Sequence, residues 1–267
     1  MQVFEFHFQQ KFEEEKTFKC CFFEPKTVHE KKLGSLYFLG EKGTFNEGIS
    51  LEEIFTYFKQ KFYKKTTFSF QKAFEEAIKE VNFYLKDKLD KKFFPDLSVL
   101  FLGIKDNKFG LGKFGEIEIQ LIRGGKLFPL LAKQKSNVFS SFKIIFGRIF
   151  SEDLISIQTK EVFEIFGKTK IFEHLKKMYP FNPKEFKEIL ESKKENFKKS
   201  GICTIFYFPK EKTQLLKEKF PLKPDSKLEI QKWKEVFSKI FEKKEIKLIL
   251  IFLFFLFLSF ALTKFLD

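Results

Sequence analysis

One apolar run near the C-terminus constrains this chain more than any other feature. Residues 248–263 read LILIFLFFLFLSFALT, without a charged side chain. Phe265 and Leu266 extend the apolar stretch beyond Lys264. A helix of about 19 such residues is roughly 28 Å long, which suits a hydrocarbon core of about 30 Å. We therefore predict a single transmembrane helix at residues 248–266.

The residues that flank this run predict its orientation. Lys243, Lys244 and Lys247 precede it, whereas only Lys264 and Asp267 follow it with a charge. The positive-inside rule then places the preceding residues in the cytoplasm. The first residues lack the basic-then-apolar layout of a signal peptide. We expect a tail-anchored, single-pass membrane protein whose N-terminal domain is cytoplasmic.

A basic connector, residues 209–247, precedes the run. It holds 12 Lys against 7 Asp and Glu. Ser226 and Glu229 have the spacing of a capping box, and apolar residues at helical spacing follow them. The pattern predicts a basic amphipathic helix. Two alternatives stay open: the helix lies on anionic lipid, or it packs on the preceding domain or forms a stem.

Composition limits the classes of function. The formal charge is 50 − 36 = +14, which is typical of proteins that bind nucleic acid or anionic lipid. The chain also holds 43 Phe and very little Arg, a bias in residue usage that explains much of this charge. We therefore expect most Phe side chains in the core and no nucleic-acid partner. Three Cys, with no C-x-x-C motif, exclude a disulfide framework and the common zinc sites.

Hydrophobic patterning in residues 2–208 changes its period several times. The alternating or short apolar runs predict strands at 2–9, 17–23, 33–39, 97–104, 109–114, 116–122, 126–131, 143–146, 154–157 and 201–208. The helical spacings predict helices at 50–62, 69–89, 159–166, 170–178 and 183–194. Helices grouped between runs of antiparallel strands indicate an α+β sandwich rather than a parallel sheet.

Four segments of this region carry motifs in a fixed order. Gly115–Leu127 reads GEIEIQLIRGGKL, close to G-D-S-R-x-Y-L-x-R-x-G-x-L. Leu36–Gly48 is similar to a strand ending in D-G-x-G-G, Asp153–Val162 to D-x-L-x-L-x-[ST]-D-G-L, and Gly201–Phe208 to D-[DN]-x-T. Together they resemble the metal-dependent protein phosphatases of the PPM type (2C-like). The resemblance covers residues 2–208 and implies an α-β-β-α sandwich.

The resemblance also implies which residues would bind metal. The family hydrolyses phosphoserine and phosphothreonine with water activated between two Mg²⁺ or Mn²⁺ ions, which aspartates hold. Three of these aspartate positions fall on Gly40, Lys160 and Gly201. An ammonium group at Lys160 would repel a divalent cation. We therefore predict that the metal site is degenerate, with no catalytic residue, no metal ligand and no cofactor.

A rebuilt metal site is the alternative. A shift of the comparison by a residue or two would bring in Glu41, Glu47, Asp153 or Glu161. The early N-E-D motif of the family corresponds loosely to Glu13–Glu15, and Glu116 stands at its hairpin aspartate. A site built from these carboxylates would make the protein a divergent Mn²⁺- or Mg²⁺-dependent serine/threonine phosphatase.

The sequence therefore predicts a membrane-tethered, catalytically inactive PPM-type phosphatase-like protein. Its expected role is that of a binding or regulatory module, a pseudophosphatase, with a protein or phosphoprotein partner. Lys42, Arg123 and Lys160 are the candidate phosphate contacts, because cationic side chains bind phosphate through charge-assisted hydrogen bonds. The two alternatives are the active phosphatase and a protein that binds anionic lipid or nucleic acid.

Overall fold

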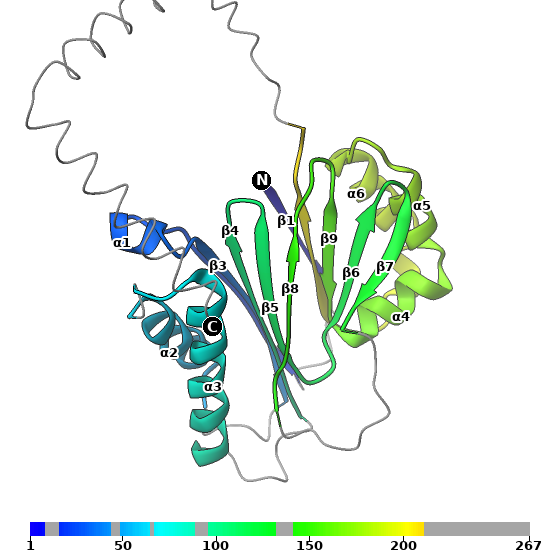
Figure 1. Ribbon diagram of the computed structural model, residues 1–267. Coiled ribbons are helices and arrows are strands. Elements are labelled where there is room, and N and C mark those ends of the chain that lie inside the picture. Colours follow the sequence, from blue (N-terminus) through cyan, green and yellow to red (C-terminus); the bar gives the residue numbers. More distant parts are fainter. Residues whose placement is uncertain (9–15, 44–48, 65–66, 89–95, 132–140, 211–267) are drawn as a thin grey trace, which may run out of the picture. The chain divides into compact units, whose positions relative to one another are not determined.

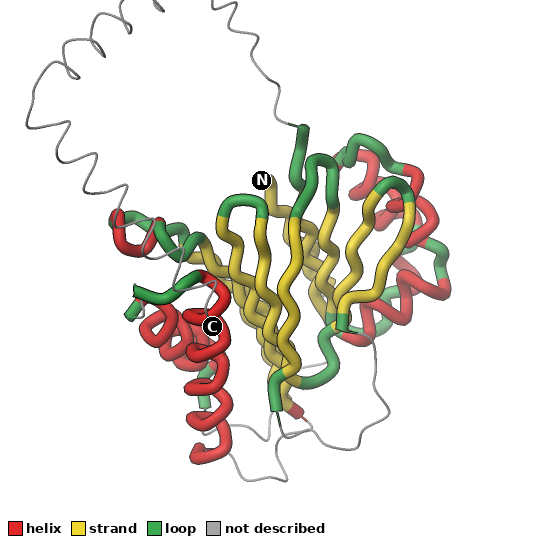
Figure 2. The backbone as a smooth tube through the Cα atoms, in the orientation of Figure 1, coloured by secondary structure: helices red, strands yellow, loops and turns green. Residues whose placement is uncertain are grey.

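Two antiparallel sheets stand face to face in the centre of the described chain (Figure 1). The structure, a computed structural model, describes residues 1–8, 16–43, 49–64, 67–88, 96–131 and 141–210. Figure 2 shows helices outside both sheets, so that the layers run helix, sheet, sheet, helix. This is the α-β-β-α order expected from the sequence.

Each sheet has five strands, and all neighbouring strands are antiparallel. The first sheet, in spatial order, consists of β1 (Gln2–Phe8), β10 (Gly201–Tyr207), β9 (Leu154–Gln158), β6 (Glu118–Arg123) and β7 (Lys126–Leu130). The second consists of β2 (Lys16–Phe23), β3 (Ser35–Gly43), β4 (Leu97–Lys105), β5 (Lys108–Phe114) and β8 (Lys143–Arg148). Chain neighbours β1 and β2 thus belong to different sheets.

Helices cover the outer face of each sheet. The second sheet is covered by α2 (Leu51–Tyr63) and α3 (Phe70–Lys88). The first is covered by α4 (Lys160–Lys168), α5 (Ile171–Lys177) and α6 (Pro183–Ser192), after which a 3₁₀ turn spans Lys194–Asn196. A capping box of Ser50 and Glu53 starts α2, and the Asn182 side chain caps α6.

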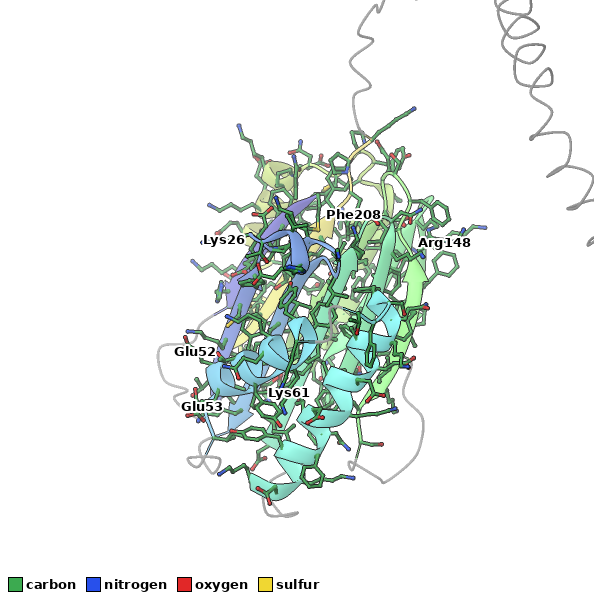
Figure 3. The ribbon with its side chains drawn as sticks, turned by 60° about the vertical axis from the view of Figure 1, so that its left-hand side comes forward. Lys26, Glu52, Glu53, Lys61, Arg148 and Phe208 are labelled. Carbon is green, nitrogen blue, oxygen red and sulfur yellow. The ribbon has the colours of Figure 1, made fainter. Side chains whose placement is uncertain are left out.

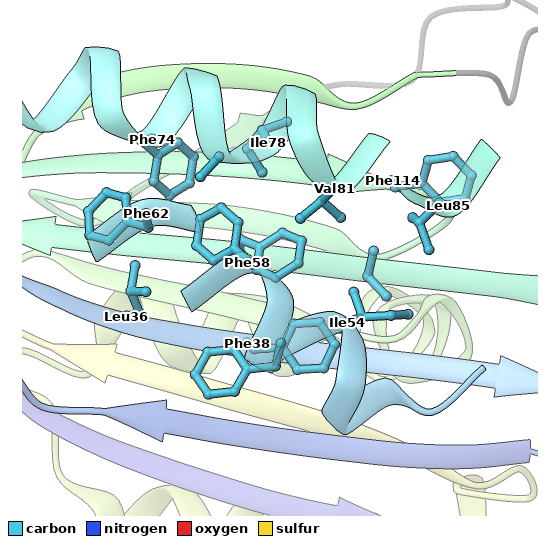
Figure 4. Close-up of a cluster of buried hydrophobic side chains, with 14 of the residues drawn as sticks. Leu36, Phe38, Ile54, Phe58, Phe62, Phe74, Ile78, Val81, Leu85 and Phe114 are labelled. Atoms are coloured by element: carbon cyan, nitrogen blue, oxygen red, sulfur yellow. The ribbon is translucent and has the colours of Figure 1, made fainter. Parts of the chain in front are cut away.

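Three apolar clusters fill the spaces between these layers. The cluster between α2, α3 and the second sheet is rich in phenylalanine, and Figure 4 shows Phe58, Phe62 and Phe74 packed together in it. The three side chains have no exposed surface. Burying one such side chain stabilises the fold by about 1.5–3 kcal/mol. The expectation that Phe serves mainly as core material is confirmed for these layers.

Close packing of α3 on the second sheet depends on glycine. A Cβ at Gly112 in β5 would lie 2.4 Å from Ile78 Cδ1. A Cβ at Gly103 in β4 would lie 3.0 Å from the rings of Phe70 and Phe74. Because glycine has no side chain, the aromatic rings of α3 lie directly on the strands.

The predicted elements of residues 2–208 agree with the structure to within a few residues. One helix, α1 (Val28–Lys31), is absent from the sequence prediction, which places no element between the strands at 17–23 and 33–39. A capping box between Thr27 and Glu30 forms its single turn. β6 begins two residues later than expected, because Gly115 turns the chain with φ of 80° before Glu118.

The predicted connector and transmembrane helix lie outside the described residues, as do Glu13–Glu15 and Glu47. Among the helices that the structure describes, none has the length and hydropathy of a membrane span. The domain boundary at residues 208/209 and the membrane anchor stay predictions.

Candidate functional site

Two neighbouring groups of ion pairs, formed by Lys16 and by Lys160, lie at one end of the sandwich, which we call the lower end after its place in Figure 1. Here β2 begins, β3 ends, and β9 leads into α4. The opposite, upper end holds the turns between β4 and β5 and between β6 and β7. The residues that the resemblance singles out are divided between these two ends.

The ammonium group of Lys16 lies between two carboxylates at the lower end. Its Nζ donates to Glu41 Oε1 at 2.5 Å and to Glu161 Oε1 at 2.7 Å. The side chain of Glu41 is 8% exposed and that of Glu161 16%, whereas that of Lys16 is 41% exposed. The carboxylates therefore lie inside the sandwich, and the lysine reaches them from its rim.

Strand alternation and a helix start bring these groups together. In β3, Tyr37, Leu39 and Glu41 point between the two sheets, since side chains alternate along a strand. Glu161 stands in the first turn of α4, where the helix dipole favours a carboxylate. That helix start is fixed to β10, because Thr159 N–H donates to Ile202 O at 3.0 Å.

The ion pairs change the pKa values of all three groups. Burial alone would lower the pKa of the Lys16 ammonium, but its hydrogen bonds to Glu161 and Glu41 raise it overall. Burial raises the pKa of Glu41 above its ordinary value, and the bond from Lys16 offsets only part of this. Burial works in the same direction on Glu161, but Lys16 and a backbone N–H outweigh it and lower that pKa.

A second ion pair lies beside the first. Lys160 Nζ donates to Glu116 Oε2 at 2.8 Å, and their side chains are 36% and 41% exposed. The backbone N–H of Glu116 donates to the Ser98 hydroxyl at 3.0 Å, which holds the turn after β5 against β4. The hydrogen bond with Glu116 raises the pKa of Lys160. Within these two ion-pair groups, two lysines and three glutamates have a summed formal charge of +2 − 3 = −1.

Several buried oxygens near this end have no hydrogen-bond partner among the described residues. Glu161 Oε2 is one of them, beside the Lys16 pair. The others are Glu118 Oε1, Gln120 Oε1 and Gln158 Oε1, on neighbouring strands β6 and β9. Lys113 Nζ lies 4.0 Å from Glu118 Oε1. These four buried oxygens can accept hydrogen bonds from water molecules.

Gly40 and Gly201 have no space for a carboxylate. A Cβ at Gly40 would lie 2.8 Å from Leu51 Cδ2 and from the Phe38 ring, on the helix side of β3. A Cβ at Gly201 would lie 2.5 Å from Thr159 Oγ1. Both positions are filled by neighbouring side chains, so an aspartate could enter only if those neighbours moved.

The three candidate phosphate contacts do not meet at one place. Lys160 lies at the lower end, and Lys42 donates to Ile49 O at 3.0 Å at the end of β3. Arg123 lies at the upper end, where its Nε and Nη2 donate to Asp153 at 2.8 and 2.6 Å. Asp153, one of the alternative metal ligands, is therefore occupied far from Glu41 and Glu161.

The sequence analysis did not single out Lys16. It named Glu41 and Glu161 as substitutes for the missing aspartates, and the structure brings these two together. The alternation of β3, which places Glu41 on the same face as Leu39, was the available signal for the carboxylate. Nothing local marks the lysine, because its role depends on the pairing of Lys16 with Gly43 across β2 and β3.

The described residues do not fit the two-metal centre that the resemblance implies. Among them, no group of three or more His, Cys, Asp and Glu side chains is placed to hold a metal ion. Glu41 and Glu161 share one ammonium, so a divalent cation would have to displace Lys16. Glu116 is in turn engaged by Lys160. Mg²⁺ and Mn²⁺ prefer several free carboxylate oxygens, which this arrangement does not offer.

No protein-family model and no curated protein sequence matches this chain. Several solved structures do. The S. agalactiae serine/threonine phosphatase superposes with a TM-score of 0.56 at 10% identity, over 78% of this chain and 99% of that one.

Two further structures agree. The PPM Ser-Thr phosphatase MsPP from Mycobacterium smegmatis gives a TM-score of 0.54 at 10% identity, over 79% of this chain and 99% of that one. The phosphatase domain of SpoIIE from Bacillus subtilis gives 0.51 at 10% identity, over 80% and 94%. The matches extend over nearly the whole length of these domains. The described part of this chain has the fold of the PPM-type serine/threonine phosphatases.

Proposed function

We propose that this chain is a membrane-tethered module with a phosphatase-like fold, which binds a partner and does not hydrolyse phosphoesters. The observation that carries the proposal is the Lys16 ammonium between Glu41 and Glu161. In the PPM reaction two divalent cations lower the pKa of a bound water and neutralise the phosphate. The Lys16 ammonium supplies positive charge between Glu41 and Glu161, but an ammonium group cannot activate water as a Lewis acid.

The lower end would be the binding surface in this proposal. Lys160 and Lys16 are partly exposed there, and Lys42 lies on the neighbouring strand end. A phosphorylated segment could replace one of the glutamates as the partner of such a lysine. Arg123 takes no part, because it serves Asp153 at the other end.

A divergent Mn²⁺- or Mg²⁺-dependent phosphatase is the second candidate. The observation that favours it is the convergence of Glu41 and Glu161, with Glu161 Oε2 buried and without a partner among the described residues. If Lys16 moved away, these carboxylates would be the groups to hold a cation. The ammonium is the obstacle, and for this reason the non-enzymatic proposal comes first.

Turnover of p-nitrophenyl phosphate by the detergent-solubilised full chain, with and without Mn²⁺, separates the two candidates. A double variant, E41Q and E161Q, is the matched control because it removes both carboxylates and keeps their size. We expect the wild-type chain to show no turnover above this control. Mn²⁺-dependent turnover that the double variant loses would establish the phosphatase instead.

The tether has its own test. The full chain is mixed with phosphatidylcholine vesicles, and its flotation is measured after a carbonate wash. We expect it to float, whereas a variant with F255K and L256K in the middle of the apolar run should stay at the bottom. Each lysine at the centre of a span costs about 2.5–3.5 kcal/mol on insertion scales. Equal behaviour of the two chains would remove the anchor from the proposal.

A further inference from the structure

Exposed apolar side chains are concentrated at the upper end of the sandwich. Eight large hydrophobic side chains are exposed among the described residues, and five of them lie there. They belong to separate segments, at the start of β1, the end of β2, α1, the loop after β8 and the residues after α5. These five are Met1 at 50% exposed, Phe22 at 50%, Val28 at 72%, Phe150 at 53% and Tyr179 at 63%.

Strand register places these segments at one end. Gln2 pairs with Tyr207, and Leu154 pairs with the same residue. In the other sheet, Phe23 pairs with Leu36 and Lys108 with Arg148. The Tyr37 hydroxyl lies 3.7 Å from the Met1 sulfur, so the two sheets meet here.

Basic side chains stand between these apolar groups. The same segments and turns expose Lys26, Lys108, Lys126, Arg148, Lys177 and Lys210. The exposed carboxylates of these segments are Glu24 and Asp106, and Asp106 is paired with Lys105. Glu30 and Glu152 are partly exposed there as well, so basic side chains still outnumber acidic ones. Figure 3 shows Lys26 and Arg148 toward this end, with Phe208, whereas Glu52 and Glu53 lie toward the other.

We infer that this upper surface lies on an anionic lipid membrane. Single aromatic and aliphatic side chains on separate loops, with lysine and arginine around them, suit the headgroup region of a bilayer. The core of a protein–protein interface is depleted of charged side chains, lysine included, whereas here lysines stand between the apolar groups. The charge of the surface is complementary to acidic phospholipids.

The course of the chain supports the same partner. The last described residues, Phe208 to Lys210, leave β10 at this upper end. The sequence then continues into the basic connector and the apolar run at 248–263. The inference rests on the tether of the proposed function and adds that the domain itself contacts lipid, through a defined face.

Tryptophan quenching in vesicles tests this face on the full chain. Trp233 is changed to Phe, and a single tryptophan is introduced by F150W at the upper end or by F83W on α3. Phe83 is the matched control, because it is 74% exposed and lies outside the upper surface. Brominated phospholipid vesicles, neutral or with phosphatidylserine, supply the quencher.

We expect at least threefold stronger quenching of the F150W indole than of the F83W indole in vesicles with phosphatidylserine. Reversal of three basic side chains, K26E, K108E and R148E, should remove most of this difference. The variant K86E and K88E at the end of α3 should keep it. Added salt should weaken the contact, since surface charges are screened.

The outcomes separate the face from the tether. Flotation with both lipids but no quenching at F150W, or equal quenching at both probes, overturns the inference and leaves the tether intact. Flotation with anionic vesicles only, together with selective F150W quenching, supports the face and removes the anchor. A chain that floats with neither lipid overturns both. A response of the F150W probe to poly(U) but to neither lipid would assign the surface to nucleic acid and overturn the inference.

Discussion

Buried carboxylates are paired with cations at both ends of the sandwich, but in different ways. At the upper end, Asp153 is 1% exposed and receives two hydrogen bonds from Arg123 and a third from Phe150 N–H. Arg123 also donates to Arg148 O, and its guanidinium lies 4.4 Å from the Phe150 ring centre. Both oxygens of Asp153 accept hydrogen bonds, as is typical of a structural ion pair.

The lower pair is less complete. One ammonium serves both Glu41 and Glu161, and Glu161 Oε2 has no partner among the described residues. A lysine ammonium is a flexible point charge, whereas a guanidinium matches a carboxylate with two fixed donors. All the oxygens of Asp153 are therefore engaged within the fold, whereas the lower pair leaves Glu161 Oε2 without a partner in the described part of the chain.

The largest effect should follow from breaking the upper pair. The substitution R123M leaves Asp153 buried without its cation, which costs about 3–5 kcal/mol. For a domain of this size that corresponds to a fall of roughly 10 °C in Tm. Thermal unfolding of the full chain in detergent measures it. The control R148M changes a second exposed arginine at this end and should shift Tm by less than a third as much.

The substitution K16M should destabilise the fold less than R123M does, and added Mn²⁺ should reverse the loss. Lys16 is 41% exposed, so water can reach its carboxylates once it is gone, and we expect a loss of about 2 kcal/mol. Mn²⁺ should restore stability to this variant, because Glu41 and Glu161 then have no cation. Ligand at one hundred times its Kd adds about 2.7 kcal/mol.

The control for K16M is K19M in the same strand. Lys19 pairs with the exposed Glu52 at 3.2 Å, and such surface pairs contribute about 0–1 kcal/mol. Mn²⁺ should not change the Tm of K19M or of the wild-type chain. If Mn²⁺ stabilised the wild type as much as K16M, the ammonium would be no obstacle to metal, and the contrast between the two ends would fail.

Sequence reasoning reached most of the fold. The two-residue alternation and the helical spacings predicted nearly every strand and helix. Each element has one buried face, so its apolar residues recur at the period of that strand or helix. The short α1 helix was not predicted, because a single turn fixed by Thr27 and Glu30 is too short to show a helical spacing of apolar residues. The order of motifs then indicated a β-sandwich with helices on both outer sides.

The site was harder to predict for a physical reason. Gly40 and Glu41 are neighbours in sequence, but they point to opposite faces of β3, so a one-residue choice decides which of them faces the space between the sheets. The pairing of Lys16 with Glu161 joins residues 145 positions apart. No local pattern encodes such a contact, and only the assembled sandwich reveals it.

The two glutamates at the lower end should respond to pH with opposite signs. The pKa of Glu161 is lowered on folding, so its contribution to stability is present above its ordinary pKa of 4.5 and is lost as the pH falls. The pKa of Glu41 is raised, so its ionised form opposes folding at neutral pH and this cost disappears in acid.

Urea unfolding of E161Q and E41Q checks these signs. At pH 7 we expect E161Q to lose about 1 kcal/mol and E41Q to lose nothing or to gain up to about 1 kcal/mol. The gap between the two variants should narrow as the pH falls below 4.5. Equal losses at pH 7 would mean that Lys16 holds both carboxylates alike, contrary to the uneven burial of the pair.

The smallest effect on stability should come from Lys160, and it separates binding from folding. Its pair with Glu116 is more than a third exposed on both sides, so K160Q should change the free energy of unfolding by less than about 0.5 kcal/mol. The control is K168Q, which changes an exposed lysine in the last turn of the same helix.

If the lower end binds phosphorylated segments, titration of the full chain with O-phosphoserine should show a response that K160Q loses and K168Q keeps. The upper end should be silent in this titration, and R148Q should therefore behave like wild type. A response that R148Q loses and K160Q keeps would move phosphate binding to the upper end and reverse the roles of the two regions.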